Sequence, residues 1–313
     1  WKGLTVGDGP SVGASTNNYN AIDFYNSIST NGGDVLIWGG NGYGGGTSGI
    51  GVQSAGSAIN AGSGNITLIG DNIGINDINI TTTGVLSLVP DGGSYPATVT
   101  WSGSLSGGNF NVTNTYDHIF INSFANLGGL AIGYCDSQIL SGTPVKQTNT
   151  SDILVSTASS IAGLIKLYGT NLTINQNLAS TGSGDISLIG NTLTIAGATT
   201  LTSAGNLIIE PITNGTTIGL AGAGTLSLTA THFTTNFTDG FSEIRIGNTS
   251  AGNITLGAAL TMRDNLRLST GGTMSLNQML DIGNNNFRFI GSSISPSANK
   301  YVKTNGTGKL YMD

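Results

Sequence analysis

The sequence reads GSGNITLIG at residues 62–70 and GSGDISLIG at residues 182–190. Four weaker copies of this phrase occur elsewhere, and the first apolar residues of the six copies are Ile66, Leu86, Ile186, Leu226, Ile254 and Met274. The steps between them are 20, 100, 40, 28 and 20 positions, so all but one are multiples of about 20. A fixed period of this length predicts a β-solenoid in which each repeat forms one coil and stacks on its neighbours.

Each copy also has the local pattern of a β-strand. Apolar residues alternate with Ser or Thr, as expected for a strand with one buried face. Glycines before and after each copy supply tight corners, where positive φ is often needed. No window keeps the period of a helix, and a β-sandwich, the main rival, would not repeat one motif in phase. We therefore predict an all-β protein with a right-handed parallel β-helix fold.

The repeats predict a single β-helix over residues 1–313, with coils of about 20 residues and some longer loops. Regular coils are expected at about 32–90 and 182–290, and irregular coils at about 90–170. Strands are still expected in the irregular part, at residues 97–101, 118–121 and 164–167. The one irregular step in the repeat predicts a loop inserted at residues 231–241. About fifteen coils would then form a rod.

The composition favours an exported protein and disfavours some partners. Only 8% of the 313 residues are charged, so Ser, Thr, Asn and Gly must cover the surface. The net charge of -6, with 10 basic residues in no sequence cluster, disfavours nucleic acid and acidic membrane surfaces. No apolar run is long enough for a membrane helix. The chain opens Trp1-Lys2-Gly3, without an initiator methionine or an evident polar cap, so we expect a mature product or a fragment of a longer chain.

Few residues suggest chemistry. His118 beside Asp117 and Cys135 beside Asp136 could face each other from neighbouring coils as base and nucleophile, but a surface or half-buried histidine and a small buried thiol in an irregular coil are the simpler interpretation. As the only cysteine, Cys135 excludes a disulfide framework. His232 is expected in the inserted loop without a partner.

The acidic and aromatic residues are interpreted in the same way. Asp71, Asp77 and Asp281 are scattered, which favours corner residues over Ca²⁺ ligands. The glycine-rich run at 39–46 lacks the Lys-Ser/Thr ending of a phosphate loop and predicts a corner. Candidates for stacking on sugars are Trp38, Tyr43 and Trp101, although Trp38 is expected in the core or shielding an end. We predict no catalytic, cofactor-binding or metal site.

Several of these phrases resemble the filamentous haemagglutinin-like β-helix proteins, which are giant exported adhesins of Gram-negative bacteria. They are GGDVLIW at 32–38, GSGNITLIG at 62–70, AGNLIIEP at 204–211 and DGFSEIRIG at 239–247. The phrase VKTNGTGKL at 302–310 is similar to a segment of large Bacteroidetes surface proteins. The resemblance implies export across the outer membrane and display as a stalk or filament. Its implied partners are other copies of the chain, or glycans and proteins outside the cell.

We therefore expect a structural and adhesive rod segment of a large cell-surface protein, and not an enzyme. The alternative is a β-helix that binds or cleaves polysaccharides. A cleaving enzyme of this fold would present a groove lined by two or more carboxylates and a Lys or Arg.

Overall fold

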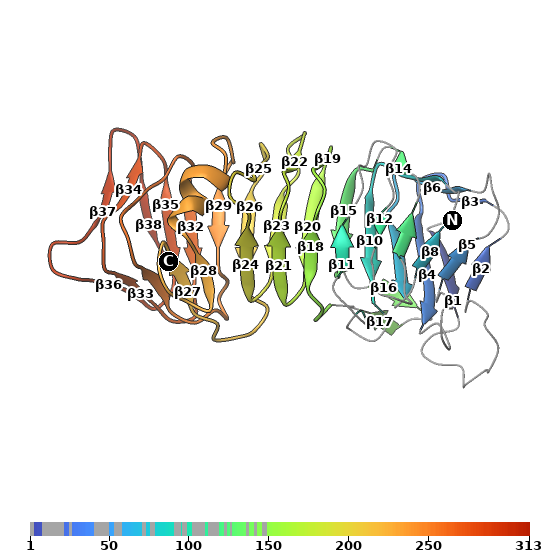
Figure 1. Cartoon of the computed structure of the whole chain (residues 1–313), viewed down its shortest axis with the longest axis horizontal. Helices are drawn as coiled ribbons and strands as arrows, with labels where there is room; N and C mark the ends of the chain where they lie inside the picture. Colours follow the sequence, from blue (N-terminus) through green and yellow to red (C-terminus); the bar gives the residue numbers. More distant parts are fainter. Residues whose placement is uncertain are drawn as a thin grey trace. The chain divides into compact units, whose positions relative to one another are not determined.

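The computed structural model describes residues 3–7, 22–24, 27–40, 50–52, 58–70, 73–75, 79–90, 95, 99–101, 110–111, 119–121, 124–125, 127–135, 138–140, 143–145 and 149–313. The chain divides into two compact units, unit 1 at Trp1–Gly169 and unit 2 at Thr170–Asp313. In this described part nearly all regular structure is β-strand (Figure 1), with one short helix at His232–Asn236. Because most strand pairs are parallel and non-consecutive in sequence, the fold is the predicted parallel β-helix.

Unit 1 coils through three parallel sheets. Its long sheet takes one strand from each coil, in the order β1 (Gly3–Gly7), β4 (Asp34–Gly40), β7 (Ile66–Gly70), β10 (Val85–Val89), β15 (Gly129–Ile132) and β20 (Leu164–Tyr168). The second sheet contains β2 (Ile22–Phe24), β5 (Ile50–Val52), β8 (Ile73–Ile75) and β13 (Ile119–Ile121). The third contains β3 (Ile28–Ser29), β6 (Ala58–Gly62), β9 (Asn79–Thr82) and β14 (Phe124–Ala125).

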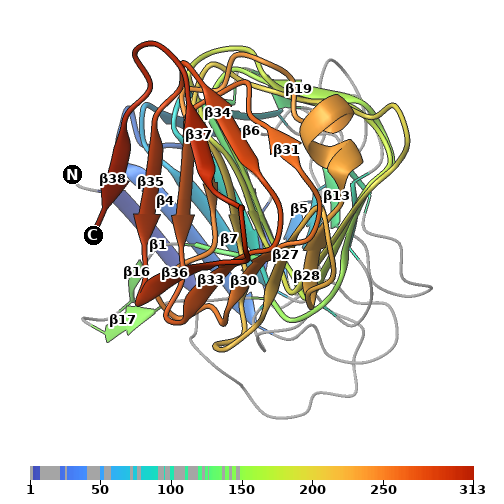
Figure 2. The ribbon, with the colours of Figure 1, turned by 90° about the vertical axis from the view of Figure 1, so that its left-hand side faces the viewer.

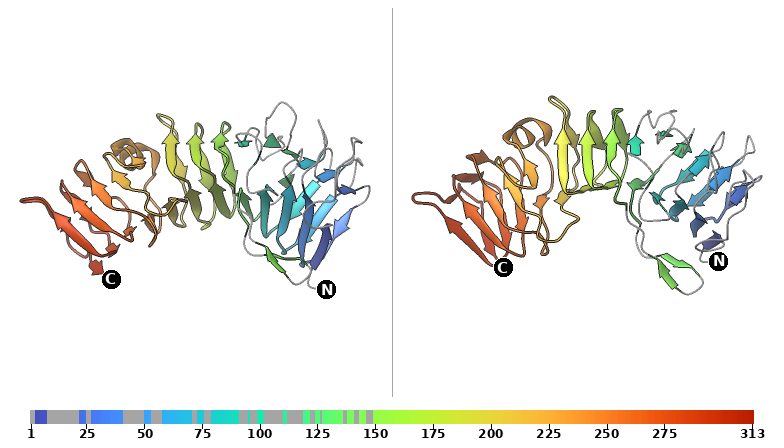
Figure 3. Two further views of the ribbon diagram at one scale, coloured as in Figure 1. Left: turned by 90° about the horizontal axis from the view of Figure 1, so that it is seen from below. Right: turned by 60° about the horizontal axis from the view of Figure 1, so that its bottom comes forward.

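Six further described strands belong to the longer coils of unit 1. They are β11 (Val99–Trp101), β12 (Phe110–Asn111), β16 (Gln138–Leu140), β17 (Thr143–Val145), β18 (Ile153–Val155) and β19 (Ser159–Ile161). Of these, β11 pairs with β18 in parallel. The antiparallel hairpin of β16 and β17 projects from unit 1 (Figure 3). The strands expected near 97–101, 118–121 and 164–167 are present as β11, β13 and β20.

Unit 2 repeats the three-sheet coil. Its long sheet runs β23 (Ile186–Ile189), β26 (Leu207–Glu210), β29 (Ile244–Ile246), β32 (Leu266–Ser269), β35 (Phe287–Ile290) and β38 (Leu310–Met312). The second side has β21 (Asn171–Ile174) beside β24 (Thr192–Ile195), then β28 (Leu226–Leu228), β27 (Ile218–Leu220), β30 (Ile254–Leu256), β33 (Thr273–Leu276) and β36 (Ser293–Pro296). The third side has β22 (Leu178–Ser180) beside β25 (Leu201–Thr202), and β31 (Leu260–Thr261), β34 (Leu280–Gly283) and β37 (Val302–Thr304).

The hand of the coil can be followed in Figure 2, which looks onto the C-terminal end of unit 2. From β35 at the left the chain passes β36 at the bottom and β37 above, and returns to β38 at the left. This path is counterclockwise while the chain advances toward the viewer, so the β-helix is right-handed, as parallel crossovers almost always are.

Buried apolar residues stack in columns along the inner face of each long sheet. In unit 1, Ile66 lies beside Leu86 and both are fully buried, which confirms the predicted stacking of these two repeats. In unit 2, Ile186 lies beside Leu207, and Leu207 beside Ile244. Burying each Leu or Ile contributes about 1.5–3 kcal/mol, so the stability of both units comes from cores that continue from coil to coil.

Coil lengths differ from the predicted 20 residues more often than the repeat suggests. In unit 1 the step from Ile66 to Leu86 is 20 positions, whereas the step from Leu86 to Leu130 is 44. Unit 2 has a step of 37 positions from Leu207 to Ile244. The described long sheets therefore have six strands in each unit. The expectation of about fifteen coils was wrong, because insertions lengthen individual coils. The prediction of one β-helix over residues 1–313 stays a prediction, since each unit is a β-helix in its own right.

Side chains at the corners join one coil to the next. A buried hydroxyl accepts from the N–H of the glycine two residues on and donates to a glycine carbonyl of the preceding coil. The hydroxyls belong to Thr82 in unit 1 and to Ser203 and Thr270 in unit 2. For Thr270 the donor–acceptor distances are 2.9 Å from the Gly272 nitrogen and 2.5 Å to the Gly252 oxygen. The position two residues after the hydroxyl is glycine because a Cβ atom there would collide with the preceding coil: at Gly84 it would lie 2.6 Å from the Gly64 oxygen.

Asn and Asp side chains form a further ladder at the corners. In unit 1, the Asn65 N–H donates to Asp34 Oδ1 at 2.7 Å, and the Val85 N–H donates to Asn65 Oδ1 at 2.9 Å. In unit 2, the Asn286 N–H donates to Asn265 Oδ1 at 2.8 Å. Each amide oxygen therefore satisfies a backbone donor that enters a strand one coil later, which fixes the register of neighbouring coils.

The longest coil of unit 2 departs from the simple repeat. After β27 the chain steps back, and β28 lies on the side of β27 opposite to β30. A Cβ atom at Gly219 would lie 2.3 Å from the Gly222 oxygen, so only glycine fits this reversal. The repeats at Leu226, Ile254 and Met274 therefore lie in the second sheet, not in the long sheet with Ile66. Treating all six copies as one phase was wrong, because two sheets use the same strand motif.

Candidate functional site

The outer face of the long sheet of unit 2 carries a column of arginines. Arg245 of β29 lies beside Arg267 of β32, which lies beside Arg288 of β35. Each arginine stands between two buried apolar residues of its strand, so the strand alternation turns all three side chains outward. We call these three residues the arginine column. The chain has four arginines, and the fourth is Arg263.

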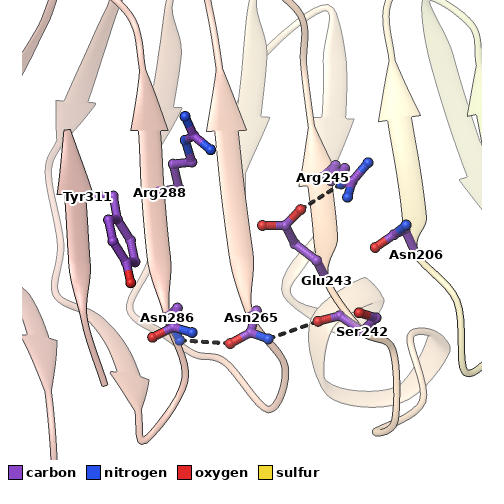
Figure 4. Close-up of a pocket in the computed structure, with 8 residues that line it drawn as sticks. All are labelled: Asn206, Ser242, Glu243, Arg245, Asn265, Asn286, Arg288 and Tyr311. Carbon is purple, nitrogen blue, oxygen red and sulfur yellow. Dashed lines mark hydrogen bonds and ion pairs between the residues drawn. The ribbon is translucent and has the colours of Figure 1, made fainter. Parts of the chain in front are cut away.

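A shallow pocket of about 330 Å³ is lined by Arg245 and Arg288, the two outer members of this column; Arg267 lies between them in register but is not part of the lining. We call this pocket the arginine groove (Figure 4); its lining residues are Asn206, Ser242, Glu243, Arg245, Asn265, Asn286, Arg288 and Tyr311. Figure 4 shows the floor of the groove as a row of polar side chains at one end of successive strands. The Asn265 side-chain amide donates to the Ser242 carbonyl at 2.8 Å, so the corner ladder holds this row in place.

Charges in and beside the groove are partly paired. The Arg245 Nε lies 2.5 Å from the Glu243 carboxylate, and Arg288 pairs with the Asp313 carboxylate. Among the described residues, Arg267 has no carboxylate partner within ion-pair distance. Neighbouring strands are about 4.8 Å apart, so the backbone positions of the three arginines follow one another at roughly this interval. The middle charge is therefore left to solvent or to an external anion.

The groove carries groups that suit binding of anions and hydroxyl groups. Its guanidinium groups can donate paired hydrogen bonds to carboxylate or sulfate oxygens. The amides of Asn206, Asn265 and Asn286 can donate to or accept from hydroxyl groups. Glu243 is the single carboxylate in its lining, so the groove does not have the two carboxylates that the polysaccharide-cleaving alternative requires.

Sequence reasoning missed this site. It found no basic cluster, because the three arginines lie 22 and 21 positions apart. The signal was present as an arginine between apolar residues at 244–246, 266–268 and 287–289, which is close to the coil period. A search for charged residues at that period would have found the column.

The candidate Cys–His pair is only partly described. Cys135 is 2% exposed, which confirms the expected buried thiol. It packs in an apolar cluster on the outer side of the long sheet of unit 1, with Leu36, Trp38, Ile69 and Val89. Asp117, His118 and Asp136 lie outside the described residues, so the pairing of Cys135 with His118 stays untested.

His232 is not in an irregular loop. It begins the short helix at His232–Asn236, on the side of the coil opposite to the long sheet (Figure 2). Its Nδ1 accepts from the Thr229 N–H at 3.2 Å and its ring packs 5.7 Å from the ring of Phe237. Burial lowers the pKa of His232 to about 4. The expectation of a loop histidine without a partner was wrong, since the insertion folds into the core.

Two polar side chains hold this insertion from the adjoining coils. The Asn236 amide donates to the Thr199 carbonyl at 2.7 Å. The Arg263 guanidinium donates to the carbonyls of Phe233 at 3.0 Å and Phe237 at 2.7 Å, which end the helix. Burial, opposed in part by a hydrogen bond from the Gly240 N–H, raises the pKa of the Asp264 carboxyl. Asn236 and Arg263 therefore stabilise the insertion and do not form a second candidate functional site.

The aromatic candidates for sugar stacking are buried where they are described. Trp38 is 7% exposed, which confirms the expectation that it packs in the protein interior, and Trp101 is fully buried. Tyr43 lies outside the described residues. Tyr134 stacks on Tyr168 at 5.5 Å, but the Lys166 ammonium lies 3.5 Å from the centre of the Tyr134 ring. None of the described ring faces in unit 1 is thus an open platform.

The acidic candidates do not gather. Asp281 lies in β34, where its carboxylate pairs with Lys303 at 3.2 Å and accepts from the Gly283 N–H at 2.9 Å. These contacts lower the pKa of Asp281, the Gly283 bond having the larger effect. Asp281 is therefore a strand residue at a bulge and not a simple corner. Asp71 and Asp77 lie outside the described residues, among which no group of three His, Cys, Asp or Glu side chains could hold a metal ion.

The only described helix is too short and too polar to cross a membrane. Comparisons of the chain with protein-family models, curated proteins and solved structures find no match. The resemblance to the filamentous haemagglutinin-like proteins therefore stays a prediction.

Proposed function

We propose that the chain is a structural and adhesive segment of a large exported bacterial surface protein. The observation that carries this proposal is the stacking of coils through both backbone and side-chain ladders. Each corner hydroxyl and each corner amide bonds to the neighbouring coil, as at Thr270 and Asn265. Such a segment resists bending between coils and can hold a binding surface away from the cell.

The surface composition supports the same proposal. Only 8% of all residues are charged, so Ser, Thr, Asn and Gly must supply most of the polar exterior. An exterior of this kind offers hydroxyl and amide groups to glycans and proteins outside the cell. The outer surface of a Gram-negative bacterium is the location that fits it best, with other copies of the chain, glycans or proteins as partners.

Localisation in the source organism tests the proposal directly. Antibodies against the purified protein should label the surface of intact cells, or filaments that extend from it, in immunogold electron microscopy. Cells that lack the gene should lose the label and should adhere less well to surfaces coated with extracellular glycans. Labelling confined to the cytoplasm, with adhesion unchanged in the deletion strain, would overturn the proposal.

A further inference from the structure

We propose that the arginine groove binds an extended acidic polysaccharide, whose carboxylate or sulfate groups contact successive arginines. This inference rests on the proposed function, because it names the ligand class of an adhesive surface. It starts from the alignment of Arg245, Arg267 and Arg288 on consecutive strands. Like charges directly opposite each other on neighbouring strands repel and are destabilising. An external polyanion would remove that repulsion.

The pairing of charges along the arginine column leaves Arg267, which lies between the two groove-lining arginines in register, as the contact for an external anion. Glu243 pairs with Arg245 and Asp313 pairs with Arg288, whereas Arg267 between them has no such partner among the described residues. Arg245 and Arg288 keep side chains that are 37% and 48% exposed, so both can still be reached. A carboxylate or sulfate over Arg267 can accept two hydrogen bonds from its guanidinium group.

The surroundings of the column favour a sugar chain over other polyanions. Asn265 and Asn286 present amides along the same row, and these groups suit hydroxyls. Tyr311 lies beside Arg288 in register and is 45% exposed, so its ring is available to a sugar face. Nucleic acid fits poorly, because its density of phosphates needs far more cations than a chain of net charge -6 supplies in one place.

Binding to defined polymers tests the inference with the full chain. Polygalacturonate supplies carboxylates, dextran sulfate supplies sulfates, and dextran supplies neither. We expect one or both charged polymers to bind in calorimetric titrations, with an affinity that falls as salt is added. Binding to polygalacturonate alone would assign the site to carboxylated sugars, and binding to dextran sulfate alone would assign it to sulfated sugars. Equal binding of uncharged dextran, or no binding of either charged polymer, would overturn the inference.

Variants locate the binding surface. Arg267→Gln should weaken binding about tenfold or more, because a hydrogen-bonded charge is lost. Arg267→Lys keeps the charge but loses the planar guanidinium group, so its affinity for the polymer should lie between those of the parent chain and Arg267→Gln. Lys303→Gln removes one positive charge from another sheet of unit 2, so it leaves the same net charge as Arg267→Gln and should bind like the parent chain. Circular dichroism and melting curves confirm that each variant is folded.

The outcomes separate this inference from the proposed function. Equal losses in Arg267→Gln and Lys303→Gln would show diffuse attraction to the whole chain and would overturn the groove as the site. A chain that labels the cell surface but ignores both polymers would keep the proposed function and end this inference. A chain that binds the charged polymers through Arg267 but is found only in the cytoplasm would keep the binding site and overturn the proposed function.

Discussion

The long sheets of the two units have the same inner face and different outer faces. In unit 1 the outward residues Leu36, Thr67 and Ser87 are all at most 8% exposed, so the sheet is buried on both sides at β4, β7 and β10. In unit 2 the outward residues include Arg245, Arg267 and Arg288, which are half-buried or exposed. A parallel sheet tolerates either arrangement, because its inner columns supply the core. The outer face is therefore where one coil architecture can differ in function.

The largest difference in stability between the two units is expected when an arginine is placed on the outer face of each long sheet. Thr67→Arg in unit 1 would bury a charge between Leu36 and Ser87, its neighbours in register, and should lower the free energy of unfolding by about 3–5 kcal/mol. Ile208→Arg in unit 2 extends the column beside Arg245 at a half-buried position and should cost within about 1 kcal/mol. Urea titrations followed by circular dichroism measure both. Similar losses in the two variants would contradict the difference between the faces.

Acid should destabilise unit 2 through its insertion. The pKa of His232 is lowered from 6.5 to about 4 in the folded chain. Between pH 6.5 and pH 4, the histidine is therefore protonated in the unfolded chain but neutral in the folded chain. Stability is therefore full above pH 6.5 and falls toward pH 4, by at most about 3 kcal/mol. Hydrogen exchange of the amides in residues 229–238 should report the loss.

His232→Gln is the matched variant, because it can still accept a hydrogen bond but does not titrate. It should flatten the pH dependence in this window. Asp264 acts in the opposite direction, since a raised pKa makes its protonation in acid stabilising. An unchanged slope in His232→Gln would show that other groups cause the acid response.

Corner hydroxyls should matter equally in both units. Thr82→Val in unit 1 and Thr270→Val in unit 2 each remove a buried hydroxyl with one accepted and one donated hydrogen bond. Each should lower the free energy of unfolding by about 1–2 kcal/mol, because the glycine groups are left without partners. Thr261→Val, on an exposed outer position, is the control and should change little. Unequal effects of the first two would show that the corners differ between units.

The smallest effect on stability is expected for Arg267→Gln. This residue has no ion-pair partner among the described side chains, so its loss should change the free energy of unfolding by no more than about 0.5 kcal/mol. Thermal melts of Arg267→Gln and of the parent chain, in buffer and with dextran sulfate, measure this difference in stability. A large loss without ligand would mean that the column serves the fold and not recognition.

The sequence was most informative where strands follow the repeat closely. Ile66 and Leu86 were predicted to stack and do so, because their spacing equals one coil. The sequence predicted the wrong position for repeats such as Leu226, because two sheets share one strand motif. A local pattern of apolar and hydroxyl residues does not show which side of the coil the strand occupies. The helix at His232–Asn236 was missed, because five residues are too few to show a helical period.

By itself, the sequence determined the all-β coil and its inner core, since alternation and period are properties of the chain that repeat in every coil. It also predicted a small buried thiol at Cys135 and a Trp38 that packs in the core or shields an end, and both side chains are buried. Tertiary structure alone decided which distant residues share a surface. Arg245, Arg267 and Arg288 form a column only because each coil brings the same strand position beside the last, and charge in one place is a property of that stacking.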